Sequence, residues 1–272
     1  MRRVFNEVTG ISFEIPDEPR IVSLAPSITD ILHTIGAWKW VVGVSIYCNI
    51  PPEAKEKPRV GAYLKVMDRR LAELEPDIIF TTTGAQRETT FKLVEEGYNV
   101  YTVPLPVSIY GIFENMFAIA NVLGLTENAL RSSKELLEEA LYTKDRLSGS
   151  VYYEIDLGGP ITAGKISYIH TALEHMGLRN IYGDVEEPWI QPDTGYVLEK
   201  NPEIILYEVK PGGDDDPERI KKMFIERGWG DVDAVKNGRI YVLEPDTLAH
   251  YGPALFKKMR SIVDTFYPSV EG

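Results

Sequence analysis

The first half of the chain alternates short apolar runs with segments of helical periodicity. Buried strands are predicted at 21–24, 41–45, 78–82 and 100–103. Between the first two, segment 27–36 has a helical apolar face made of Ile28, Ile31, Leu32 and Ile35. Ser27 is expected to cap this helix and Gly36 to end it. Strands that alternate with helices predict βαβ units and a largely parallel sheet.

A second alternating series follows in the other half. It predicts strands at 151–155, 204–207 and 240–243, and helices at 167–176 and 253–266. The stretches LEPDIIF (74–80) and EKNPEIILY (199–207) resemble each other: a proline turn and an acid precede an apolar strand. This internal similarity predicts two similar α/β lobes.

The segment between the two series, 126–147, contains neither Gly nor Pro and has leucines and alanines at helical spacing. At about 1.5 Å per residue it predicts a helix of roughly 33 Å. The fold expected from the pattern is therefore an α/β protein of two Rossmann-like lobes with mostly parallel sheets, joined by one long linker helix. The boundaries expected are 1–125 for the first lobe, 126–148 for the linker helix and 149–272 for the second lobe.

Composition narrows the class of protein. The chain of 272 residues is 44% hydrophobic and 26% charged, as in ordinary globular proteins. Its net charge of -12 argues against nucleic-acid binding, which needs clustered Lys and Arg. No apolar run is long enough for a membrane span, and the N-terminal stretch lacks the apolar segment of a secretory signal. The protein is expected to be cytoplasmic unless a signal has been removed, in which case it is extracytoplasmic.

Residues that could carry out catalysis are sparse. There is no GxSxG elbow and no phosphate-binding loop, and Cys48 is the sole cysteine. His170 and His175 are five residues apart, which suits paired metal ligands on a helix poorly. The acids 214–216 lack the spacing of a calcium loop and predict a solvated turn before a helix. His250, in a loop between a strand and a helix, is the one histidine expected to contact a ligand. We therefore expect a binding protein, not an enzyme, with no metal site of its own and no covalent cofactor.

The chain resembles a known family at several ordered motifs. The stretch RIVSLAPSITDILHTIGAWKWVVGVSIYCNIPPEAKEKPRVGAY (20–63) and LAELEPDIIF (71–80) are similar to the first lobe of the solute-binding proteins that serve ABC transporters for vitamin B12, ferric siderophores and haem. The second lobe agrees through TAGKISYIHTALEHMGLRNIYGD (162–184), NPEIILYEV (201–209) and RGWGDVDAVKNGRIYVLEPD (227–246). VTGISFEIPDEPRIVSL (8–24) is similar to the hairpin that precedes the first strand. The opening stretch and EEPWIQPD (186–193) are closest to the cobalamin-binding members.

The resemblance implies a ligand held in a cleft between the lobes, which would be a cobalt corrinoid or another metal chelate. A corrin is flat, large and mostly apolar, and tyrosine offers a rigid face with a hydroxyl for the rim. Pro51 and Pro52 would limit the freedom of the loop between Tyr47 and Tyr63. The residues that the resemblance places at the cleft are Pro26, Ser27, Tyr47, Tyr63, Thr82, Thr83, Trp189, Thr247, His250 and Tyr251.

The sequence departs from the family at the expected contacts with a membrane permease. Transport members carry one exposed glutamate on each lobe, and the matching positions here are Arg69 and Gly195. Asp68 and Asp193 lie close by and could substitute. A reversed charge at Arg69 would repel a basic socket. This raises an alternative, a monomeric corrinoid-binding protein of the same fold that stays in the cytoplasm and does not dock on an ABC permease.

Other ligands and one enzyme class stay open. Cobalamin binders often have tryptophan where this chain has Tyr63, Thr82 and Thr247, so a smaller chelate such as cobinamide, or a ferric siderophore, is an alternative ligand. A metal-chelate-processing enzyme of nitrogenase-like architecture would need several cysteine ligands for its clusters, and Cys48 alone cannot supply them.

Overall fold

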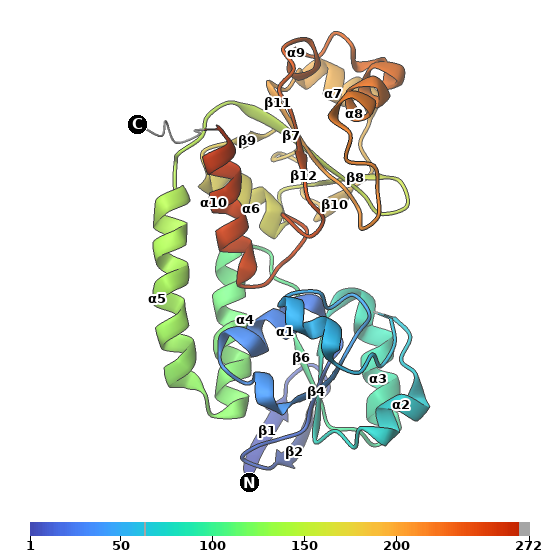
Figure 1. Ribbon diagram of the computed structural model, residues 1–272, viewed down its shortest axis with the longest axis vertical. Coiled ribbons are helices and arrows are strands. Elements are labelled where there is room, and N and C mark those ends of the chain that lie inside the picture. Colours follow the sequence, from blue (N-terminus) through green and yellow to red (C-terminus); the bar gives the residue numbers. More distant parts are fainter. Residues whose placement is uncertain (63, 267–272) are drawn as a thin grey trace. The chain divides into compact units, whose positions relative to one another are not determined.

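The computed structural model describes residues 1–62 and 64–266, and these divide into two compact units. Unit 1 comprises Met1–Pro106, Tyr110–Leu136 and Gly252–Ala254, and unit 2 comprises the rest of the chain. The division falls inside helix α5, Thr126–Thr143, between Leu136 and Leu137 (Figure 1).

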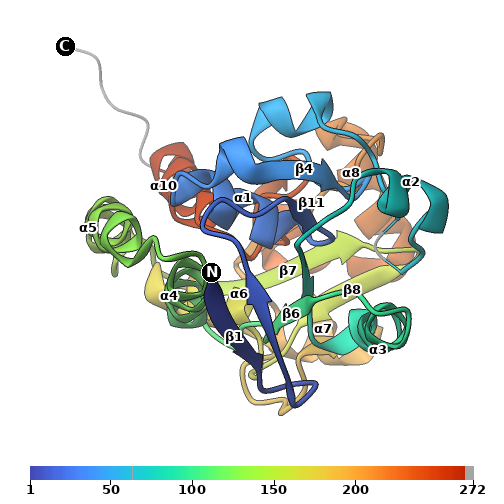
Figure 2. The ribbon, with the colours of Figure 1, turned by 90° about the horizontal axis from the view of Figure 1, so that it is seen from below.

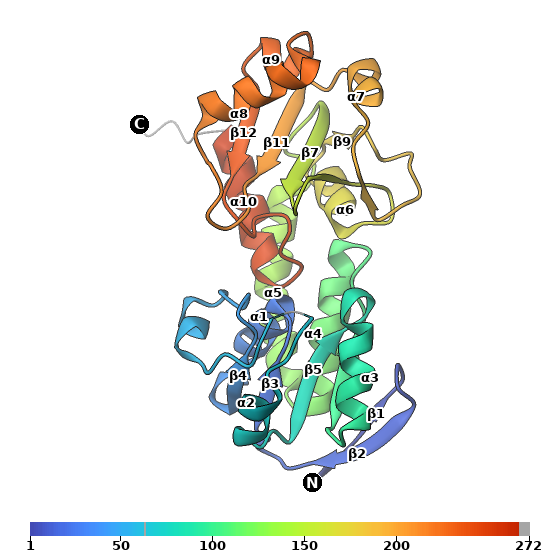
Figure 3. The same cartoon turned by 90° about the vertical axis from the view of Figure 1, so that its right-hand side faces the viewer.

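Unit 1 is built on a four-stranded parallel sheet in the order β4-β3-β5-β6. Its strands are β3 (Ile21–Ser23), β4 (Val41–Val44), β5 (Ile78–Thr82) and β6 (Val100–Val103). Its helices are α1 (Pro26–Thr34), α2 (Asp68–Glu73), α3 (Arg87–Glu95) and α4 (Ile109–Leu123), with short 3-10 turns at Trp38–Trp40, Pro52–Glu56 and Gly84–Gln86. Leu71 of α2 and Leu93 of α3 join one buried cluster with Val22 and Ile79 of the strands, so both helices cover the same face (Figure 3).

A two-stranded antiparallel hairpin precedes this sheet, as expected. It pairs β1 (Arg2–Asn6) with β2 (Ile11–Ile15). The amide of buried Asn6 donates to the carbonyl of Val100 at 2.8 Å, which fixes the hairpin beside β6 (Figure 2).

Unit 2 contains a six-stranded mixed sheet in the order β10-β8-β7-β11-β12, with β9 also paired to β7. The strands are β7 (Ser150–Asp156), β8 (Pro160–Ala163), β9 (Arg179–Asn180), β10 (Trp189–Ile190), β11 (Ile204–Glu208) and β12 (Ile240–Leu243). The strands β7, β9, β11 and β12 are parallel, whereas β8 and β10 pair antiparallel. The helices are α6 (Tyr168–His175), α7 (Thr194–Lys200), α8 (Pro217–Phe224), α9 (Asp233–Lys236) and α10 (Ala254–Phe266), with a π turn at Ile225–Trp229.

The two faces of this second sheet are covered by different helices. Tyr152 and Ile205 of the strands share a buried cluster with Val197 of α7, Phe224 of α8 and Val235 of α9. Helices α6 and α10 lie on the opposite face (Figure 1). Alternate residues of β7 and β11 therefore point into different environments, which decides where their polar side chains can find partners.

Two predicted helix boundaries were wrong. Helix α1 begins at Pro26, and its N-cap is Ala25 without a side-chain bond, so Ser27 is not the cap. The fixed φ of proline suits the first helical position, where its missing N–H is not needed. Helix α5 ends at Thr143, not at 147, because the backbone turns left-handed at Asp145 (φ 52°) and then pairs with the segment after α6. The end of α1 is as predicted: Gly36 has φ 77°, and the amide of Ala37 bonds the Leu32 carbonyl at 2.8 Å.

Candidate functional site

The predicted ligand residues of unit 1 lie at the carboxyl ends of its parallel strands. Pro26 and Ser27 follow β3, Tyr47 follows β4, Thr82 ends β5 and Thr83 follows it. Ligands of such sheets bind at this edge. Ser27 and Thr82 are buried, Pro26 and Thr83 are partly exposed, and Tyr47 is 51% exposed. Tyr63 lies outside the described residues.

Tyr47 lies on a loop whose ends are tied together. The amide of Ile46 donates to the carbonyl of Gly61 at 2.8 Å, and Val60 donates to Val44 at 3.0 Å. The Arg59 guanidinium donates from Nη1 to the carbonyls of Ser45 at 2.7 Å and Cys48 at 2.9 Å. One cation therefore holds the backbone on both sides of Tyr47, so this exposed ring is presented by a constrained loop.

A residue that the sequence reasoning missed, Gln86, joins two strand ends in unit 1. Its Oε1 accepts from the amide of Thr82 at 2.9 Å and from the Thr82 hydroxyl at 3.1 Å. Its Nε2 donates to the carbonyl of Leu24 at 3.0 Å. Gln86 is 0% exposed. The hydroxyl of Thr82 is thus engaged by Gln86, and Gln86 links the end of β5 to the residue that follows β3.

In unit 2, a third aromatic ring brings two predicted ligand residues together. The ring of Tyr168 lies 6.3 Å from that of Trp189 and 5.7 Å from that of Tyr251, measured between centroids. Tyr168 is buried, whereas the other two are partly exposed. The sequence reasoning missed Tyr168, whose only local signal is its place in the first turn of the helix after β8. Together the three form an aromatic cluster, Tyr168–Trp189–Tyr251, in unit 2.

The loop after β12, which contains Thr247 and His250, is tied to a buried acid. The carboxylate of Glu208, at the end of β11, accepts from the backbone amides of Thr247, Leu248 and Ala249. Burial raises the pKa of Glu208 to about 7, although these hydrogen bonds oppose the shift. The side chains of Thr247 and His250 are themselves buried, and the Thr247 hydroxyl donates to the Glu244 carbonyl at 2.7 Å.

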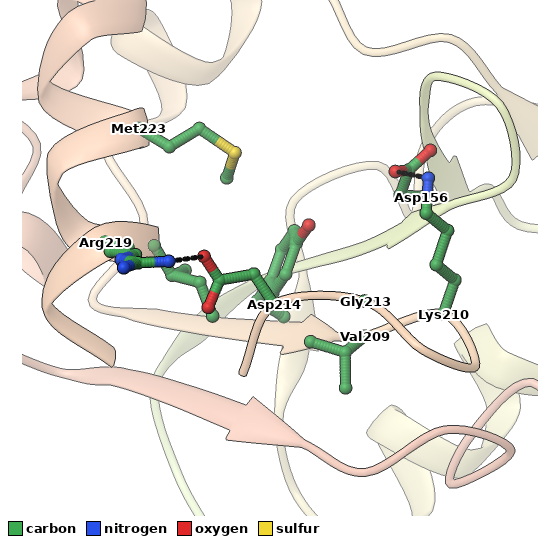
Figure 4. Close-up of a pocket in the computed structure, with 9 residues that line it drawn as sticks. Asp156, Val209, Lys210, Gly213, Asp214, Arg219 and Met223 are labelled. Atoms are coloured by element: carbon green, nitrogen blue, oxygen red, sulfur yellow. Dashed lines mark hydrogen bonds and ion pairs between the residues drawn. The ribbon is translucent and has the colours of Figure 1, made fainter. Parts of the chain in front are cut away.

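A pocket in unit 2 lies beyond the ends of β7 and β11 and is lined partly by charged side chains (Figure 4). It has a volume of about 320 Å³. Lys210 pairs with Asp156 at 2.6 Å, and Arg219 pairs with Asp214 at 3.2 Å. The bond from Lys210 is the main reason that the pKa of Asp156 is lowered. Both cations are thus already paired with acids.

His175 and the acidic turn 214–216 make structural hydrogen bonds. His175 contacts the Ala140 carbonyl through Nε2 at 2.8 Å, at the end of α6. Asp216 caps α8 by accepting from the amide of Glu218, which confirms the predicted turn before a helix.

Across residues 1–62 and 64–266, no group of three His, Cys, Asp or Glu side chains is arranged to hold a metal ion. A search of the same residues finds no helix with the length and apolarity of a membrane span.

The two positions predicted to differ from the permease contacts are exposed. Arg69, on α2, pairs with Glu73 at 3.0 Å, and Gly195 lies in the first turn of α7. The nearby acids have structural partners. Asp68 pairs with Lys92 at 3.1 Å, and Asp193 caps α7 by accepting from the amide of Tyr196 at 2.7 Å. Neither acid is therefore an unengaged replacement for a docking glutamate.

Comparison with known proteins agrees with this architecture. The family model described as periplasmic binding protein matches residues 21–247. An uncharacterized ABC transporter substrate-binding lipoprotein of Bacillus subtilis is 26% identical over 93% of this chain and 82% of its own length. A vitamin B12-binding protein of Salmonella paratyphi A is 29% identical over 85% of this chain and 86% of its own.

A solved structure shows the same fold. The periplasmic haem-binding protein of Roseiflexus sp. RS-1, in its apo form, superimposes with a TM-score of 0.79. The match covers 92% of this chain and 98% of that chain, at 22% sequence identity. At this identity the likeness supports the fold alone.

Proposed function

This chain belongs to the periplasmic binding protein family, and we propose that it is a solute-binding protein for ABC-type uptake whose ligand is a corrinoid, a flat cobalt chelate of the cobalamin type. The relatives named as vitamin B12-binding proteins support this choice, since the match to one of them extends over 85% of this chain. The rings that contact the ligand in this proposal are those of the aromatic cluster Tyr168–Trp189–Tyr251 and of Tyr47. The cleft between the lobes predicted from the sequence stays a prediction.

The observation that carries the proposal is the aromatic cluster of unit 2. Trp189 and Tyr251 both pack against the buried ring of Tyr168, which fixes their positions before any ligand binds. Rigid aromatic faces lose little entropy on binding and suit a broad, mostly apolar macrocycle. Tyr47, on its constrained loop, adds a further exposed ring in unit 1.

Charge favours a corrinoid over an anionic chelate. Corrinoid side chains end in neutral amides, whereas haem carries two carboxylates, which arginine or lysine would pair. In unit 2, Lys210, Lys165 and Arg219 are each paired with an acid. Recruiting one of them would break an ion pair. The net charge of -12 also repels anions at long range.

A titration tests the ligand class directly. Purified protein is titrated with cyanocobalamin, dicyanocobinamide, haemin and a ferric hydroxamate siderophore, and tryptophan fluorescence is followed. The proposal requires saturable one-to-one binding of at least one corrinoid. Binding of the siderophore or haemin with no response to either corrinoid would replace the corrinoid by an iron chelate. For a tryptophan of the proposed site, such as Trp189 in the variant Trp189→Ala, the matched control is Trp38→Ala. Trp38 lies just before β4, at the amino end of that strand.

An ABC permease is the proposed protein partner, and the proposed location is extracytoplasmic, as the relative named a substrate-binding lipoprotein suggests. The positions of Arg69 and Gly195 favour a second candidate, a corrinoid binder that does not dock, because the neighbouring acids are engaged in an ion pair and a helix cap. Co-purification of the chain with a permease encoded in the same genome, in the presence of ligand, would exclude the second candidate.

A further inference from the structure

Glu208 makes an unusual set of hydrogen bonds for a side chain that the solvent does not reach. It is 0% exposed. Its Oε1 accepts from the amide of Thr247 at 2.9 Å, and its Oε2 accepts from the amide of Leu248 at 2.7 Å. The amide of Ala249 lies 3.2 Å and 3.1 Å from the two oxygens. Three consecutive amides thus converge on one carboxyl group.

The same short loop is held from its other side. The hydroxyl of Tyr168 donates to the carbonyl of Ala249 at 2.7 Å. Both polar groups of the Ala249 backbone are therefore bonded to side chains of other elements. Tyr153, on β7, donates from its hydroxyl to Oε2 of Glu208 at 3.0 Å and holds the carboxylate in turn.

The loop 247–249 leads directly into the aromatic cluster. The chain runs from Ala249 through His250 directly to Tyr251, whose ring packs on Tyr168. A shift of the loop backbone would move Tyr251 away from the ring that positions it. Glu208 cannot act on a ligand directly, because it is fully buried, so any effect on binding passes through the loop.

We propose that Glu208 is a positioning residue for ligand binding: its carboxylate fixes the backbone of 247–249 and thereby holds Tyr251 in the aromatic cluster Tyr168–Trp189–Tyr251. The part that concerns ligand binding rests on the proposed function, whereas the fixing of the loop does not. A loop that is ordered in advance lowers the entropy cost of binding.

Amide hydrogen exchange tests the fixing of the loop. It is measured over 245–251 in wild type, Glu208→Gln and Glu208→Met. The glutamine keeps the shape and one acceptor, and the methionine keeps the approximate shape without an oxygen. We expect exchange at the amides of 247–249 to rise about tenfold in Glu208→Gln and further in Glu208→Met. The matched control is Glu203→Gln, because Glu203 also accepts from a backbone amide, that of Ser150 at 2.7 Å, but at the opposite end of the sheet.

The affinity for cyanocobalamin tests whether the fixed loop supports ligand binding. We expect its Kd to rise about tenfold in Glu208→Gln, with wild-type affinity in Glu203→Gln. Tyr168→Phe, which keeps the ring and removes the hydroxyl that bonds the Ala249 carbonyl, gives a smaller rise and serves in place of Glu208→Gln if that variant does not fold. Unchanged exchange at 247–249, or faster exchange with an unchanged Kd, would overturn the proposal. If wild type binds no corrinoid, the proposed function fails, and the exchange data still decide whether Glu208 fixes the loop.

Discussion

Arg227 and Glu154 form an ion pair in which one partner is completely buried. Nη1 of Arg227 lies 2.8 Å from Oε1 and 2.7 Å from Oε2 of Glu154. Glu154 is 0% exposed, whereas the side chain of Arg227 is 28% exposed. The hydroxyl of Tyr152 also donates to Glu154. Burial, together with the charge of Glu154 and this hydrogen bond, raises the pKa of Tyr152 well above its ordinary value. The pair lies on the face of the sheet opposite to that of Glu208.

Removal of the cation of this pair should destabilise unit 2 strongly. We expect Arg227→Met to lower the free energy of unfolding by about 3–5 kcal/mol, because it leaves a buried carboxylate without a counter-charge. Urea denaturation followed by circular dichroism measures the loss. The double variant Arg227→Met with Glu154→Gln should recover much of it. The exposed pair Lys222–Glu226 is the control, and Lys222→Met there should cost less than about 1 kcal/mol. Equal losses at the two sites would contradict this account.

The pH dependence of stability should report on Glu208. Its pKa is about 7 in the folded protein, above the ordinary 4.5. A raised pKa means that the folded state binds the proton more tightly, so the stabilisation is complete below pH 4.5 and is lost as the pH rises through about 7. Relative to Glu208→Gln, the wild type should lose up to about 3 kcal/mol across this window.

Urea midpoints at pH 5, 6, 7 and 8 check this expectation. Because other groups also titrate, the result is the difference between the two profiles. Glu203→Gln should follow the wild-type profile, since it leaves the Glu208 site intact. Parallel profiles for wild type and Glu208→Gln would show that this carboxyl does not titrate in the window.

Loss of the aromatic anchors should weaken corrinoid binding. We expect Trp189→Ala and Tyr47→Ala each to reduce the binding free energy by about 1–3 kcal/mol, as is usual for truncated aromatic anchors. Isothermal titration with cyanocobalamin gives the affinities, and Trp38→Ala should bind as wild type does. Wild-type affinity in both Trp189→Ala and Tyr47→Ala would remove these rings from the binding site.

The order of the loop that contains Tyr47 should depend on the side chain of Arg59. This side chain bonds two carbonyls, those of Ser45 and Cys48, from one nitrogen. Arg59→Ala should raise the Kd for cyanocobalamin about tenfold and speed amide exchange over 45–49, because the loop then loses its charge-assisted bonds. Arg69→Ala, an exposed arginine on α2, should change neither quantity. An affinity change without faster exchange would point to direct contact between Arg59 and the ligand.

Much of the fold could be predicted from local patterns. The strands β5, β6 and β12 have the predicted bounds, because each is a short apolar run that a turn signal ends. The alternation of strands with helices was predicted in the same way, whereas the hairpin β1–β2 was expected from the resemblance of 8–24 to the family. The helix ends at Ser27 and after Thr143 were predicted wrongly, because one backbone conformation outweighed propensity there, and the short strands β8, β9 and β10 were not predicted.

The candidate site was predictable only in part. The resemblance to the family assigned Tyr47, Thr82 and Thr247 to the ligand site, and each of them ends or follows a parallel strand, at the edge where ligands of such sheets bind. Gln86, Tyr168 and Glu208 could not be found in this way. Their partners are 62 residues away at Leu24, 81 at Ala249 and 39 at Thr247. Periodicity reports which residues are buried, but only the tertiary structure decides which buried polar group meets which backbone amide or carbonyl, because those partners come from distant segments that folding brings together.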